Sequence, residues 1–229
     1  MRWDEYIKGT TKVKFFIEGL PRSGKTCLAA SASKIGKTLY IDAEGGLVSA
    51  RKFVNKDNIE IEKISTINSD VCLKQLEGAM IKAMSGKYEW IVLDSITEIS
   101  GQLEDQYAKK EGGGSVKDWM TIVEKVKKIG RFLRDGDFHC IVTALLKGGD
   151  GNEPVLPGST AIVLPSFYNT LSKIQVLKIG GAMRRTLVSD GLMAVSVGDR
   201  LNILDSTEPI DEQNPELILA KLVNGILSM

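Results

Sequence analysis

The feature that most limits the possible folds of this chain is the stretch KFFIEGLPRSGKT, residues 14–26, where a hydrophobic run ends at a loop bounded by glycines. Gly19, four residues and then Gly24-Lys25-Thr26 give the spacing of a loop that binds phosphate through its backbone N–H groups. The run before the loop has the length and composition of a β-strand, and the small residues after it favour a helix. A glycine turn with a solvated lysine is the alternative. The order strand, loop, helix favours a phosphate site.

Each part of this loop has a chemical reason to be there. The glycines let N–H groups turn inward around a phosphate, and a helix that begins near Gly24 adds the positive end of its dipole. Lys25 supplies a mobile full charge, and Thr26 offers a hydroxyl suited to Mg²⁺. The predicted nucleotide-binding residues of the loop are Gly19, Leu20, Pro21, Arg22, Ser23, Gly24, Lys25, Thr26 and Cys27.

Composition excludes several classes of protein. The 229 residues carry a net charge of +1, so any contact with nucleic acid must come from local patches rather than from a strongly basic chain. Cys27, Cys72 and Cys140 form no CxxC pair and are expected to be reduced thiols, and His139 is the only histidine, which argues against a metal site beside Cys140. The charged start and the lack of a long apolar run predict a soluble, cytoplasmic protein without a membrane partner. If a phage encodes it, the location would be the host cytoplasm.

Strands and helices alternate over the first 145 residues. Short hydrophobic runs predict strands at 13–17, 37–43, 59–64 (an edge strand), 90–93 and 139–145. Amphipathic patterns predict helices at 69–84, 96–107 and 116–133. The later part predicts a hairpin of 172–178 with 184–188 around Gly180-Gly181, and a tail helix at 215–227.

This order predicts an α/β fold with a mostly parallel central sheet, helices on both faces and a hairpin-rich C-terminal part, because parallel neighbours need crossover connections. A dinucleotide-binding Rossmann site is disfavoured, since the first loop lacks GxGxxG. The length predicts one domain over 1–229, with a short N-terminal segment 1–12, a core 13–180 and a C-terminal hairpin and tail helix 181–229.

Carboxylates follow two of the predicted strands. Asp42 and Glu44 end the run YIDAEGG, and Asp94-Ser95 ends WIVLD. Ligands of open parallel sheets bind at the carboxyl ends of the strands, and an aspartate there can hold the Mg²⁺ shell together with Thr26. The alternatives are a turn at Asp42 and Glu44, a helix-cap or surface acid at Glu44, and a strand-end cap at Asp94.

Taken in order, GLPRSGKT, YIDAEGGL, WIVLDSI and CIVTAL resemble the core of the RecA recombinase family over about residues 12–180. The resemblance is closest to small phage AAA-type nucleotide-binding proteins with a minimal RecA core, some of which are single-strand annealing proteins. It implies a RecA-like P-loop NTPase fold and Mg²⁺-dependent ATP hydrolysis. It further implies that Glu44 polarises the attacking water, that Asp94 holds Mg²⁺ through water, and that Thr143 lies where the family senses the γ-phosphate.

The same resemblance places DNA-facing loops at Ala108 to Asp118 and at Lys147 to Val163. The lysines in these segments are the predicted contacts to single-stranded DNA: Lys109, Lys110, Lys117 and Lys147. The expected role is therefore recombination or strand annealing on single-stranded DNA, and a cognate single-strand-binding protein is a further candidate partner. The neighbouring aromatic residues Trp119, Phe167 and Tyr168 are expected to belong to the core.

Late arginines are candidates for a contact in trans with a neighbouring subunit's nucleotide, because an arginine can stabilise transition-state charge. Arg184-Arg185 and Arg200 qualify, and the GDR stretch favours Arg200 as the catalytic arginine of a homo-oligomer. Two other functions stay open: a small-molecule or nucleotide kinase with a glycine-rich lid, and a non-catalytic nucleotide-dependent interaction module.

Overall fold

A central β-sheet organises the computed structural model, which describes residues 12–108, 115–147, 153–189 and 198–228. Its strands are β1 (Lys14–Gly19), β2 (Thr38–Asp42), β3 (Ile59–Lys63), β4 (Trp90–Asp94), β5 (His139–Leu145), β6 (Thr170–Ile179), β7 (Ala182–Val188), β8 (Gly198–Asp199) and β9 (Thr207–Pro209). The mixed α/β class and the mostly parallel sheet predicted from the sequence are confirmed.

The strand order is β3-β2-β4-β5-β1-β6-β7-β9, with β8 paired to β6. The strands from β3 to β6 in this order are parallel, whereas β7, β8 and β9 pair antiparallel. The register aligns Gly19 with Leu145 and Asp42 with Asp94, so the carboxyl ends of β1, β5, β2 and β4 share one edge of the sheet. β5 separates the strand that leads into the loop from the strand that ends in Asp94.

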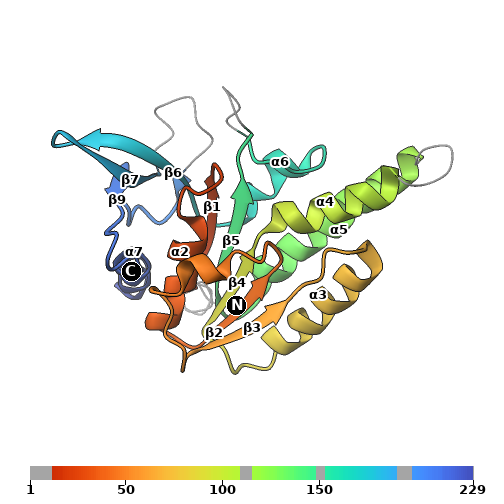
Figure 1. Cartoon of the computed structure of the whole chain (residues 1–229), viewed down its shortest axis with the longest axis horizontal. Coiled ribbons are helices and arrows are strands. Elements are labelled where there is room, and N and C mark those ends of the chain that lie inside the picture. Colours follow the sequence, from red (N-terminus) through yellow and green to blue (C-terminus); the bar gives the residue numbers. More distant parts are fainter. Residues whose placement is uncertain (1–11, 109–114, 148–152, 190–197, 229) are drawn as a thin grey trace, which may run out of the picture.

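Helices cover both faces of the sheet (Figure 1). They are α2 (Lys25–Ala30), α3 (Ser69–Ala83), α4 (Ile96–Ala108), α5 (Val116–Asp135), α6 (Thr160–Val163) and α7 (Glu216–Leu227). Short 3₁₀ helices are η1 (Ser31–Lys34), η2 (Leu47–Ala50) and η3 (Pro165–Phe167). α3, α4 and α5 pack against one hydrophobic face, and α2 and α7 against the other.

The strands are hydrophobic on both sides because both faces are covered. Along β1, Phe15 and Ile17 join the cluster with α2 and α7, whereas Phe16 joins the cluster with α3 to α5. Each of these side chains is fully buried, which contributes about 1.5–3 kcal/mol of hydrophobic free energy per side chain. The period-two pattern of the strand therefore sends neighbouring side chains into different helical layers.

The described part of the second predicted DNA loop, residues 153–163, is packed rather than free. A β-bridge joins Leu146 to Pro154, and α6 follows against α5. A Cβ at Gly130 of α5 would lie 2.1 Å from Leu164, so glycine permits this close approach. Tyr168 is buried in the same cluster, as expected for a core residue, and Trp119 and Phe167 are partly buried against it.

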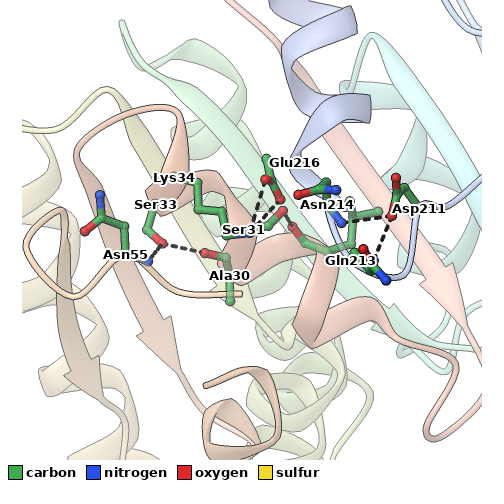
Figure 2. A network of polar contacts seen from close by, with 10 residues as sticks. Ala30, Ser31, Ser33, Lys34, Asn55, Asp211, Gln213, Asn214 and Glu216 are labelled. Atoms are coloured by element: carbon green, nitrogen blue, oxygen red, sulfur yellow. Dashed lines mark hydrogen bonds and ion pairs between the residues drawn. The ribbon is translucent and has the colours of Figure 1, made fainter. Parts of the chain in front are cut away.

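β6 and β7 form the predicted hairpin, which extends from one side of the molecule (Figure 1). Gly180 and Gly181 have φ of 58° and 86°, as a two-residue hairpin turn of type I′ requires. Figure 2 shows how the C-terminal part joins the rest: Lys34 of η1 donates to both carboxylate oxygens of Glu216 in α7, each at 3.1 Å. Within the described residues, every helix is too short or too polar to cross a membrane.

Candidate active site

The predicted phosphate loop connects the end of β1 to the start of α2. Gly24 has φ of 107°, a conformation that favours glycine, and a Cβ at Gly19 would lie 2.5 Å from Ser23 Oγ. Lys25 is folded back over the loop, where its ammonium donates to the carbonyl oxygens of Gly19 at 2.8 Å and Leu20 at 3.1 Å. The backbone conformation therefore favours glycine at position 24, and the close approach of the Ser23 side chain favours it at position 19.

Two features of the loop fit a bound phosphate. Ser23 Oγ is buried and has no hydrogen-bond partner among the described residues, although a buried hydroxyl normally has one. Burial lowers the pKa of Lys25, while Glu44 and Asp94 oppose that shift. An anionic oxygen in the loop would accept from the unpaired hydroxyl and would favour the charged form of the lysine.

Asp94, at the end of β4, is completely buried and accepts from three hydroxyl groups. Oδ2 accepts from Thr26 at 2.9 Å and from Tyr40 at 2.6 Å, and Oδ1 accepts from Thr143 of β5. The two oxygens of a carboxylate offer enough lone pairs to accept all three bonds. The bond to Thr26 places the two predicted metal-binding residues side by side, and the Asp94–Ser95 peptide bond that follows is cis.

Glu44 lies next to this pair, just past the end of β2. The backbone N–H of Glu44 donates to the Asp94 carbonyl at 3.2 Å, and the Ser95 hydroxyl donates to Glu44 Oε1 at 2.8 Å. A Cβ at Gly46 would lie 3.7 Å from Thr26 Oγ1 and 4.0 Å from Glu44 Oε2, so both groups border the same small space. The residue is exposed as a whole, yet partial burial of its carboxyl raises the pKa and the Ser95 bond opposes that rise.

A cavity of about 570 Å³ opens on this loop, a volume within the range of ligand pockets in proteins. The loop, the start of α2 and Glu44 supply part of its lining. The other lining residues are Ser49, Phe53, Leu145, Arg185, Ile210, Asp211, Glu212 and Pro215. The cavity therefore extends well beyond the phosphate loop, and both apolar and polar side chains line the additional space.

Sequence reasoning missed part of this site. The sequence assigns Tyr40 no role beyond its place in the run YIDAEGG, yet its hydroxyl donates to Asp94. Arg185 was considered only as a trans arginine, whereas it lines this chain's own cavity. The segment 210–215 carries no motif that marks it as a cavity wall.

The remaining predicted residues lie elsewhere. Arg200 sits at the amino-terminal end of β6, where its guanidinium donates to the Ser166 carbonyl at 3.0 Å. Lys117 is exposed in the first turn of α5, and Lys147 is exposed just after β5, 4.0 Å from Glu153. Lys109 and Lys110 lie outside the described residues.

The model of a family described as the AAA domain matches residues 11–152, which include the phosphate loop, Glu44, Asp94 and all of β5. The chain belongs to the AAA domain family. The fold and the family together make it an AAA-type P-loop ATPase, a nucleotide-binding and nucleotide-hydrolysing protein. Among solved structures, it is similar to the KaiC-like protein PH0186 of Pyrococcus horikoshii OT3, with 14% identity, 88% of this chain and 87% of that chain covered, and a TM-score of 0.49. No curated protein matches the chain.

P-loop ATPases of this kind generally use ATP and Mg²⁺, and the residues of this AAA domain fit both. The loop N–H groups, Ser23 and Lys25 would hold phosphate oxygens, and Thr26 with Asp94 would hold the metal. Bound Mg²⁺ neutralises negative charge on the phosphates. The exposed Glu44 carboxylate borders the same space as Thr26 Oγ1, beside Gly46.

Proposed function

We propose that this AAA domain is a Mg²⁺-dependent ATPase that binds single-stranded DNA and assists phage-type homologous recombination or strand annealing. The observation that best supports the link between nucleotide and DNA lies on β5. Thr143 donates to the buried Asp94 carboxylate, and the same strand leads within a few residues to the exposed Lys147. A change around the metal-binding aspartate can therefore reach a predicted DNA contact through one continuous strand.

The predicted DNA contacts are lysines, which bind the phosphate backbone without reading sequence. Lys117 and Lys147 are exposed, and the ion pair of Lys147 with Glu153 is long and solvated, so it competes weakly with a phosphate. If about two to four lysines contact phosphates in each subunit, the logarithm of the affinity should fall with the logarithm of salt at a slope of roughly −1.5 to −3.

Fluorescence anisotropy with a labelled oligothymidine, in ATP and Mg²⁺, tests the DNA part of the proposal. The double variant Lys117→Ala/Lys147→Ala should bind more weakly and show a slope shallower by about 1.4. Lys74→Ala, at an exposed position of α3, is the matched control and should bind like the wild type. A lack of binding by the wild type at low salt would refute the proposal.

Turnover separates this function from its two alternatives. Lys25→Ala should abolish nucleotide binding, whereas Glu44→Gln should keep binding and lose hydrolysis by about 10² to 10⁴-fold, the usual contribution of a general base. A non-catalytic nucleotide-dependent module would show no turnover in the wild type. A small-molecule kinase would transfer phosphate to a nucleotide or metabolite without any stimulation by DNA.

Arg200 enters the proposal as a residue that acts in trans in a homo-oligomer. It lies at the amino end of β6, whereas the phosphate loop follows the carboxyl end of the parallel neighbour β1, so the two lie at opposite edges of the sheet. Its use in catalysis therefore needs a second subunit. Mixing the Arg200→Ala and Lys25→Ala proteins tests this. Some interfaces of the mixed oligomer combine an intact Lys25 from one subunit with an intact Arg200 from the other, and these should restore hydrolysis. If the mixture stays as inactive as each variant alone, a trans role is refuted.

A further inference from the structure

One wall of the cavity comes from β7 and from the segment that leads into α7. Arg185 of β7 lies against the tightest turn of the phosphate loop: a Cβ at Gly24 would be 3.3 Å from its Cδ and 3.7 Å from its Nε. The charge of Arg185 also reaches Cys27, where it opposes the burial that raises the pKa of the thiol. Arg185 therefore borders the loop where phosphate is expected, in the same chain.

Arg185 is held by an ion pair that is easy to break. Its Nη1 donates to Glu212 Oε1 at 3.0 Å, and the two side chains remain 44% and 65% exposed. Exposed pairs contribute little because water solvates both charges well. A polyphosphate offers the guanidinium more negative charge and a geometry that suits bidentate bonding.

The segment that carries Glu212 is fixed by other contacts. The Asp211 carboxylate accepts from the backbone N–H groups of Gln213 at 2.7 Å and Asn214 at 3.0 Å, and Glu216 pairs with Lys34 just beyond α2 (Figure 2). The Ile210 N–H also donates to the Arg185 carbonyl at 2.9 Å. Loss of the side-chain pair therefore leaves the wall in place, and only the guanidinium needs to move.

We propose that Arg185 binds a phosphate of the nucleotide in its own chain and that Glu212 occupies it until the nucleotide enters. This inference rests on the proposed binding of nucleotide at the phosphate loop. Binding exchanges one carboxylate for a phosphate oxygen, which releases Glu212 at the surface next to α7. Glu212 is thus an internal competitor of the nucleotide.

The test compares the dissociation constants of a fluorescent ATP analogue and, by competition, of inorganic tripolyphosphate. Arg185→Ala should weaken both ligands by about 10- to 100-fold, the usual range for a charge-assisted hydrogen bond. Glu212→Gln should tighten both by about two- to fivefold, because it removes the competing charge. The control is Lys178→Ala, an exposed cation of β6 in the same hairpin that does not line the cavity, which should change neither dissociation constant by more than about twofold.

The opposite signs distinguish binding from a structural role. If the pair only stabilises the wall, Arg185→Ala and Glu212→Gln should both weaken binding, and that result would overturn the inference. If Arg185→Ala weakens the affinity for the ATP analogue but not for tripolyphosphate, the inference is also overturned, because the arginine would then contact the nucleoside. If Lys25→Ala abolishes binding and Arg185→Ala binds like the wild type, the proposed function stands and this inference falls. A wild type that binds neither ligand refutes both.

Discussion

His139 should make the stability of the protein depend on pH near neutrality. The imidazole lies at the start of β5, where Nδ1 accepts the backbone N–H of Val13 at 2.9 Å and the ring stacks on Trp90. Burial, followed by the charges of Lys12 and Lys14, lowers the pKa of this imidazole from 6.5 to about 4. A nitrogen that accepts a hydrogen bond cannot carry a proton, so the contact with Val13 requires the neutral ring.

The direction in which the free energy of unfolding changes with pH follows from proton binding. Between pH 6.5 and about 4 the unfolded chain binds a proton at His139 that the folded chain does not, so stability is complete above pH 6.5 and is lost as pH falls toward 4. From pH 7 to pH 5, these two pKa values predict a loss of about 2 kcal/mol in the free energy of unfolding. The full loss through pH 4 approaches about 3 kcal/mol.

Urea unfolding at several pH values measures this loss. His139→Asn is the control variant, because asparagine offers an acceptor oxygen at a similar position and does not titrate. The difference in the free energy of unfolding between wild type and variant should therefore fall by about 2 kcal/mol between pH 7 and pH 5. Since this is the only histidine in the chain, NMR of its ring protons reports the folded pKa directly. A folded pKa near 6.5, or equal pH dependence in both proteins, would refute the reasoning.

Two further predictions concern packing and the buried carboxylate. Tyr40→Phe should lower the free energy of unfolding by about 1.5–3 kcal/mol, because it removes a hydrogen bond to the charged Asp94, and an unchanged urea midpoint would contradict this. Gly130→Ala should destabilise the protein despite the better helix propensity of alanine, since its Cβ would lie 2.1 Å from Leu164 and overpacking costs about 1–3 kcal/mol. Gly78→Ala on α3 is the control: it meets no atom within 4 Å and should stabilise by up to about 1 kcal/mol.

The sequence predicted the layered fold well because the relevant signals are local. A buried parallel strand needs a short run of large apolar residues, and the runs around Phe16, Leu93 and Val142 have that form. The apolar stripe of each helix of three turns or more predicted that helix. The helix after the phosphate loop is the exception: α2 ends at Ala30 and continues as η1, because its small residues give no periodic stripe from which to read a length.

The contacts of Asp94 show where sequence reasoning stops. The residue itself was predicted from its place at a strand end, but its three hydroxyl donors come from a helix and two other strands. Which tyrosine or threonine faces it depends on the register of β2 and β5 beside β4, and register is a property of the assembled sheet. A tyrosine within a hydrophobic strand fits the core equally well whether or not its hydroxyl has a functional partner.

The same difference between local motif and assembled contact explains why the sequence predicts one side of the cavity and not the other. One continuous loop must supply several N–H groups to a phosphate, so its glycines and its lysine need a fixed spacing that a motif can reveal. The opposite wall needs only a suitable surface at the right place, and it is brought there by the pairing of β9 with β7 and by the ion pair between Lys34 and Glu216. Many sequences satisfy that requirement. Arg185 therefore becomes a credible ligand of the nucleotide only once the folded hairpin sets it over Gly24, which no spacing along the chain encodes.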